Sequence, residues 1–100
     1  MFVILAAILL NMEKVIIRKL SLDEIENLGI RNWPVWEKEV SCFNHFYTET
    51  EECYFLEGEV TIETEANQYQ LKPGDFVTFM ENLSCSWNIK SPVKKHYNFP

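Results

Sequence analysis

The segment that decides the fold reads EECYFLEGEV and covers residues 51–60. Its centre, Cys-Tyr-Phe-Leu at residues 53–56, is apolar at four successive positions. Because neighbouring residues of a strand point to opposite faces, this strand should be covered on both sides. Gly58 has turn chemistry. We therefore expect one strand over residues 53–57, a turn at Gly58, and a second strand over residues 59–65.

Short apolar runs separated by turn residues continue on either side of this segment. Residues 85–89 alternate clearly, with Cys85, Trp87 and Ile89 on an apolar face and serine or asparagine between them. This spacing is typical of a sandwich or barrel. Further strands are predicted over residues 15–17, 35–39, 41–48, 68–71, 76–80, 85–89 and 95–99. The chain is therefore expected to be an all-β domain.

One helix interrupts the strand pattern. Ser21 and Glu24 have the spacing of a capping box, and Gly29 follows at the position where a helix commonly ends. We expect a short N-terminal helix that lies against the outside of the barrel.

Residues 1–11 are apolar and precede a second methionine, Met12. They are too few to span a bilayer, which takes about 20 residues, and they lack the basic start and the cleavage site of a signal peptide. We interpret them as an extension outside the fold, from a mis-chosen start codon, with a truncated membrane anchor as the alternative. The predicted organisation is this extension followed by a single domain over residues 12–100.

Composition and net charge restrict the kinds of partner that this chain is expected to bind. The 100-residue chain carries a net charge of -6, and its nine basic residues form no cluster, so a nucleic-acid partner is not expected. The doublet Lys94-Lys95 is interpreted as a solvated strand end. Three cysteines without paired spacing argue against a disulfide framework. A reducing, cytoplasmic location is predicted, with no membrane partner.

A second segment, LKPGDFVTF at residues 71–79, follows the first at a characteristic distance. Together the two segments resemble the signature stretches of the cupin superfamily. This resemblance implies a double-stranded β-helix, a jelly-roll-like barrel. The stretch NWPVWEKE at residues 32–39 and the terminal KHYNF at residues 95–99 further resemble the small single-domain cupins grouped with (S)-ureidoglycine aminohydrolase.

The cupin resemblance also implies a site. Its family pattern places three histidines and a glutamate around a divalent metal at the centre of the barrel, and this chain has His45, Tyr47, Cys85 and Glu51 at those positions. Imidazole, carboxylate and thiolate can all bind zinc or iron. One interpretation is therefore a metal site of His45, Glu51 and Cys85 that holds Zn, Fe or Mn. The alternative is a site without metal, in which Tyr47 and Glu51 form a polar pair, Cys85 packs in the core and His45 lies at the rim.

Three of these residues are candidates for catalysis. An isolated carboxylate inside a barrel is costly unless it is paired, protonated or used, so Glu51 is a candidate general acid or base. Tyr47 is expected to lie within reach of Glu51. Cys85 could act as a nucleophile if a cation lay nearby. We expect Glu51 and Cys85 to point into one cavity.

Three functions remain open at this point. The first is an enzyme that acts on a small nitrogenous metabolite, and the second is a non-catalytic module that binds a small molecule. The third is self-association. The apolar outer face of residues 53–56, together with Trp33, Trp36 and the aromatic C-terminus, forms a larger apolar surface than a small monomer usually exposes. A homodimer is therefore expected.

Overall fold

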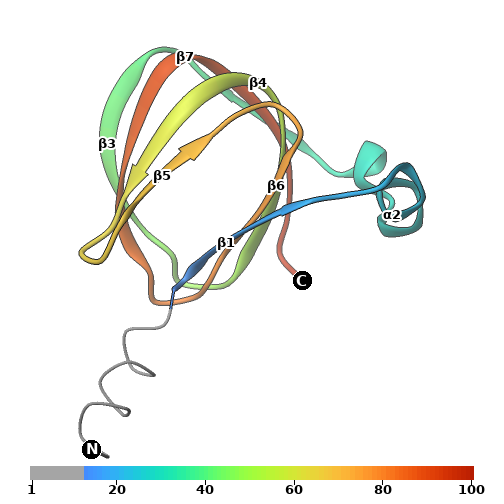
Figure 1. Ribbon diagram of the computed structural model, residues 1–100, viewed down its shortest axis with the longest axis horizontal. Coiled ribbons are helices and arrows are strands. Elements are labelled where there is room, and N and C mark those ends of the chain that lie inside the picture. The colour runs from blue at the N-terminus through green and yellow to red at the C-terminus, as the bar shows by residue number, and fades with distance from the viewer. Residues whose placement is uncertain (1–12) are drawn as a thin grey trace, which may run out of the picture.

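Antiparallel strands form one rolled, unclosed sheet in the computed structural model, which describes residues 13–100 (Figure 1). The predicted extension at residues 1–11 lies outside the described residues. The strands are β1 (Val15–Lys19), β2 (Val35–Lys38), β3 (Ser41–Phe46), β4 (Glu51–Glu63), β5 (Gln68–Leu71), β6 (Asp75–Phe79) and β7 (Ser84–Asn98). The helical elements are α2 (Leu22–Leu28) and the 3-10 turn η1 (Ile30–Asn32). The predicted all-β architecture with one short helix is confirmed.

The two long strands organise the sheet. Its order is β1-β6-β4-β7-β2, with β3 added to β7 and β5 added to β4. The first part of β4 pairs with β6 and the last part with β5, while β7 pairs first with β3 and later with β2. β4 and β7 pair with each other along most of their lengths. The sheet therefore curls around this central pair, as Figure 1 shows.

Both long strands were predicted as two shorter ones, and this prediction is wrong. Gly58 does not end a strand; it lies in a series of register shifts within the β4–β7 pair, with a φ of 98°. A Cβ at this position would lie 2.5 Å from the carbonyl oxygen of Pro92, on the opposite strand. Irregular pairing of this kind bends a strand without ending it, and it accommodates a proline that cannot donate a hydrogen bond.

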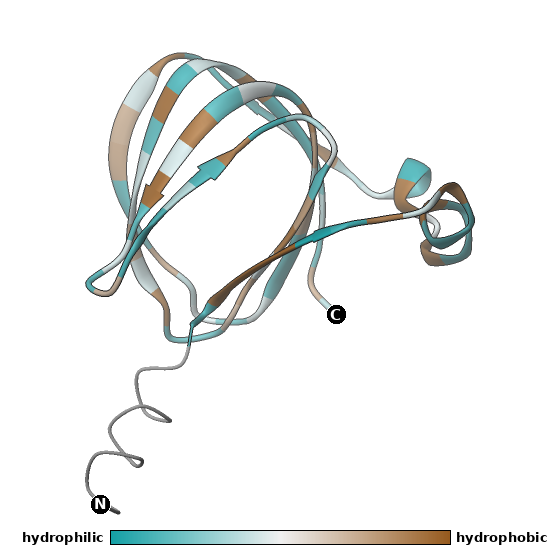
Figure 2. Cartoon of the chain, viewed as in Figure 1, coloured by the Kyte–Doolittle hydropathy of each residue, from teal (hydrophilic) through white to brown (hydrophobic). Residues whose placement is uncertain are grey.

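Apolar side chains at alternate positions along the strands form the core. Along β7, buried residues at Cys85, Trp87 and Ile89 alternate with exposed ones, as predicted, and Figure 2 shows the alternating hydropathy along the rolled strands. The fully buried side chains of the barrel include Phe55, Phe79, Ile62, Leu71, Ile89, Val60, Val77 and Cys53. Apolar side chains thus fill much of the interior of the rolled sheet.

The helix forms as predicted and covers part of the outer surface. Ser21 and Glu24 make both hydrogen bonds of the capping box, and Gly29 ends the helix with a φ of 69°. Ile25 and Ile30 pack with Tyr54 in a small second cluster outside the barrel. The chain's own helix and 3-10 turn therefore cover part of the outer face of β4 at Tyr54, which is partly buried. The predicted homodimer stays a prediction.

The glycine-aspartate turn has a structural role. The Asp75 carboxylate is buried, accepts a hydrogen bond from the backbone N–H of Lys72, and forms an ion pair with Lys19 of β1. It thereby joins the β5–β6 turn to the first strand. Asp75 does not line the cavity described below.

A pair of glycine substitutions tests the bulge. Gly58→Ala should destabilise the protein by about 3 kcal/mol or more, because it adds a backbone clash to the cost of a positive φ. Gly74→Ala is the matched control: its φ is 92°, but a Cβ there meets no atom within 4 Å. It should cost only about 1–2 kcal/mol. Chemical denaturation measures both, and equal losses would show that the contact with Pro92 is unimportant.

Candidate functional site

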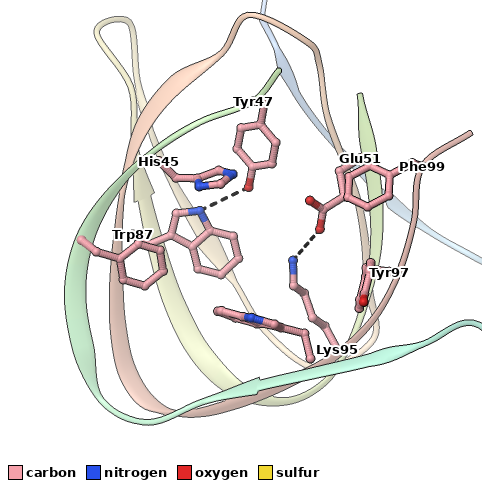
Figure 3. Close-up of a pocket in the computed structure, with 9 residues that line it drawn as sticks. His45, Tyr47, Glu51, Trp87, Lys95, Tyr97 and Phe99 are labelled. Atoms are coloured by element: carbon pink, nitrogen blue, oxygen red, sulfur yellow. Dashed lines mark hydrogen bonds and ion pairs between the residues drawn. The ribbon is translucent and has the colours of Figure 1, made fainter. Parts of the chain in front are cut away.

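A cavity of about 310 Å³ opens into the barrel. Aromatic side chains form most of its wall, and charged or polar groups lie at its inner end (Figure 3). The lining residues are Trp36, Phe43, His45, Tyr47, Glu51, Trp87, Lys95, Tyr97 and Phe99. Two larger hollows, of about 510 and 640 Å³, are lined mainly by polar residues of β3, β4, β5 and β7. The smaller cavity is the candidate site because it alone of these three contains a buried ion pair.

That ion pair joins Glu51 at the start of β4 to Lys95 near the end of β7. Lys95 Nζ lies 2.8 Å from Glu51 Oε2, and the two side chains are only 6% and 12% exposed. The Cys53 thiol completes a triangle, with Sγ 3.0 Å from both Glu51 Oε2 and Lys95 Nζ. Glu51 and Cys53 share one face of β4 because they are two residues apart. The predicted isolated carboxylate is therefore a paired one.

Aromatic rings surround the ammonium group. Lys95 Nζ lies 5.0 Å from the ring centroids of both Trp36 and Trp87. A cation over an aromatic face is stabilised by the ring quadrupole, most strongly where water is excluded. The positive charge of Lys95 thus has favourable neighbours in a place where burial alone would oppose it.

Titration behaviour follows from these contacts. Burial on its own would lower the pKa of Lys95, but the charge of the Glu51 carboxylate and the hydrogen bonds to Glu51 and Cys53 raise it above its usual range. Burial also raises the pKa of the Cys53 thiol, which therefore stays protonated. The inner end of the cavity therefore holds the Lys95 ammonium, ion-paired with Glu51, beside a neutral thiol.

Tyr47 lies on the opposite side of the cavity, directly after β3. Its ring stacks on Phe79, and its hydroxyl oxygen accepts a hydrogen bond of 3.3 Å from Trp87 Nε1. Burial raises the pKa of this phenol, so its own proton is retained and can be donated. The ring of His45 stands edge-on to Tyr47 with centroids 4.4 Å apart, and it is exposed at the rim. Tyr47, His45 and Glu51 are therefore brought together, as expected.

Cys85 is not brought to the same cavity. It is buried in the core beside the neighbouring hollow that contains Ser84 and Glu63, and it does not line the wall around Glu51. Burial raises the pKa of Cys85 to about 11, so the thiol is protonated near neutral pH. A protonated thiol is a poor nucleophile, and the expected convergence of Glu51 and Cys85 in one cavity is not observed.

The donor set does not fit a divalent metal. Within residues 13–100, no three histidine, cysteine, aspartate or glutamate side chains form a group that could hold one. The three predicted ligands lie apart: His45 at the rim of the cavity, Glu51 at its inner end, and Cys85 in the adjoining core. The carboxylate of Glu51 already carries the Lys95 ammonium at 2.8 Å, and a divalent cation beside that ammonium would be repelled.

Sequence reasoning missed Lys95 and Cys53. Lys95 was interpreted as part of a solvated doublet, whereas it is 5% exposed. A signal was present: in a strand over residues 95–99, Lys95 shares a face with Tyr97 and Phe99, and all three line the cavity. Likewise Cys53 shares a face with Glu51. Alternation alone would have placed the thiol beside the carboxylate and Lys95 on the cavity face of its strand, whereas the pairing of β4 with β7 brings the lysine to Glu51.

Comparison with known proteins gives the family. The model of the EutQ-like cupin domain matches residues 25–97 of this chain. The chain belongs to the EutQ-like cupin family. This EutQ-like cupin is 44% identical to a DUF861 family protein from Thermotoga maritima, whose crystal structure matches with a TM-score of 0.84. That match covers 86% of this chain and 99% of the other.

More distant structures share the fold. A putative ethanolamine utilization protein EutQ from Salmonella typhimurium is 17% identical with a TM-score of 0.58, over 83% of this cupin and 66% of that chain. A predicted oxalate decarboxylase from Thermotoga maritima is 19% identical with a TM-score of 0.52, over 83% and 76% of the two chains. No curated protein matches. In residues 13–100 the cupin has no helix long and apolar enough to cross a membrane.

Thiol accessibility tests the assignment of the cysteines. Of the three free thiols, Cys42 is exposed whereas Cys53 and Cys85 are buried. In the native protein near pH 8, iodoacetamide should therefore modify Cys42 alone, because the raised pKa values of the other two suppress their thiolates. Mass spectrometry should show one adduct in the native protein, three after unfolding, and none in native Cys42→Ser. Modification of native Cys85 at the rate of Cys42 would contradict its placement in the core.

Proposed function

We propose that this protein is a cupin that binds a small polar molecule in the aromatic cavity, with Glu51 and Lys95 as its principal contacts. The observation that carries the proposal is the buried ion pair that faces the cavity. A charged pair held inside a barrel is expensive to desolvate. Such a pair is typical of a functional site when it lies in a concave, mainly aromatic pocket.

Hydrogen-bonding groups at the inner end restrict the ligand. Among residues 13–100, Glu51 makes its hydrogen bonds through Oε2, which leaves Oε1 to accept a bond from a ligand. Figure 3 shows this second oxygen on the cavity side of the carboxylate. Opposite it, the Tyr47 hydroxyl and the remaining proton of Lys95 are donors. A compound with an N–H donor next to a carbonyl acceptor complements this arrangement.

Amide and ureido compounds have that pattern. Their planar group would pack against the aromatic wall of the cavity, where Trp36 and Trp87 meet edge to face, and a volume of about 310 Å³ suits a molecule of metabolite size. The resemblance to cupins grouped with (S)-ureidoglycine aminohydrolase supports the same chemical class. Glu51, ion-paired with Lys95, would accept the ligand's N–H hydrogen bond and is placed to act as a general base.

Binding of a small panel tests this function. Trp36 and Trp87 line the cavity, so their fluorescence should change when N-carbamoylglycine or a simple primary amide binds, whereas glycerol should have no effect. Tyr47→Phe removes one donor while keeping the stacked ring, and it should weaken binding about threefold to tenfold. Glu51→Gln should weaken binding at least about tenfold, or about 1.4 kcal/mol.

Glu57→Gln is the matched control, because Glu57 forms an exposed ion pair with Lys94 and should bind as the unaltered protein does. Ammonia release in the same samples would distinguish a catalyst from a binding module. Absence of any binding at millimolar concentrations, or equal binding by Glu51→Gln in a folded state, would contradict the proposed site.

A further inference from the structure

Lys95 places a positive charge directly beside the carboxylate of Glu51. Glu51 stands where the cupin pattern has its metal-binding glutamate, yet its carboxylate is already bound to an ammonium nitrogen at 2.8 Å. The lysine comes from a strand that pairs with β4, because Phe55 and Lys95 are register partners. A cation is therefore present in the site as part of the chain.

The groups around this ammonium stabilise a positive charge. Nζ donates to Glu51 Oε2 and lies 3.0 Å from Cys53 Sγ, and the two indole faces of Trp36 and Trp87 lie 5.0 Å away. The lysine side chain is 6% exposed. The ammonium is thus surrounded by a carboxylate, a sulfur atom and two aromatic rings. These groups come from β2, β4 and β7.

We propose that the Lys95 ammonium is the resident cation of this cupin barrel, in the role that a divalent metal has in metal-binding cupins. Two of its three protons are directed to Glu51 and Cys53, and the third is available to the cavity that Lys95 lines. It would donate to the carbonyl or carboxylate oxygen of a ligand. This second half of the inference rests on the proposed function, whereas the first half does not.

Removal of the ammonium should expose a metal-binding pair. Cys53 Sγ and Glu51 Oε2 lie 3.0 Å apart, and a thiol next to a carboxylate is a donor pair that zinc and cadmium bind. With Lys95 in place, its charge repels a divalent cation. Lys95→Ala removes the charge and leaves space for a metal and its water ligands.

Metal titration without any organic ligand tests the first half. Zn²⁺ or Cd²⁺ is added to the unaltered protein, to Lys95→Ala, and to Lys94→Ala as the exposed neighbouring control, with calorimetry and the ultraviolet absorption of a cadmium–thiolate bond as readouts. Lys95→Ala should bind one equivalent at least tenfold more tightly than the other two. Addition of Cys53→Ser to Lys95→Ala should abolish the thiolate absorption, and methylammonium should compete with the metal.

The unaltered protein provides a test that does not depend on the stability of a variant. Its melting temperature, and the affinity of any compound that binds, should be unchanged after treatment with EDTA. Stoichiometric binding of Zn²⁺, Mn²⁺ or Fe²⁺ to the unaltered protein that is lost in Glu51→Gln would overturn the inference, as would a folded Lys95→Ala that gains no metal. Compounds that bind only with added metal would overturn it while leaving the proposed function intact. Failure of every compound to bind would end the proposed function but not the result of the metal titration.

Discussion

The antiparallel pairing of β4 with β7 is the constraint on which the rest of the molecule depends. It connects the strands on either side of it into one sheet, because each long strand pairs with different partners along its length. The irregular pairing near Gly58, which packs against Pro92, bends the pair without ending it. The same register places Lys95 opposite Phe55, so the pairing that forms the barrel also brings a lysine to the carboxylate of Glu51.

Charge inside the barrel follows from that register. Burial of either Glu51 or Lys95 alone would leave an uncompensated charge in an aromatic environment, which is strongly unfavourable. Together, and with the Cys53 thiol and two indole rings around them, the charges compensate one another. The cavity is therefore polar at its inner end and aromatic at its wall. A site of this kind combines a fixed donor with a fixed acceptor at a short distance.

Much of the fold, and part of the site, could be predicted from the sequence. Two features depend only on residues close together in the sequence: the alternation of apolar and polar residues around Trp87, and the capping box at Ser21. Both were predicted correctly. The continuous β4 was missed because Gly58 has the chemistry of a turn, and only its close contact with Pro92 shows that it serves a bend. Glu51 could be found from its motif. Its partner is 44 residues away, and a lysine doublet ordinarily marks a solvated strand end, so the ion pair required the register of β4 and β7.

The central claim is that Glu51 and Lys95 act as one electrostatic unit, and a double-mutant cycle on the free energy of unfolding tests it most directly. Glu51→Gln and Lys95→Met should each destabilise the protein by about 3–5 kcal/mol, because each leaves one buried charge without its partner. The double variant should cost no more than either single one, which corresponds to a coupling energy of several kcal/mol. Effects that simply add, with a coupling below about 0.5 kcal/mol, would contradict the account.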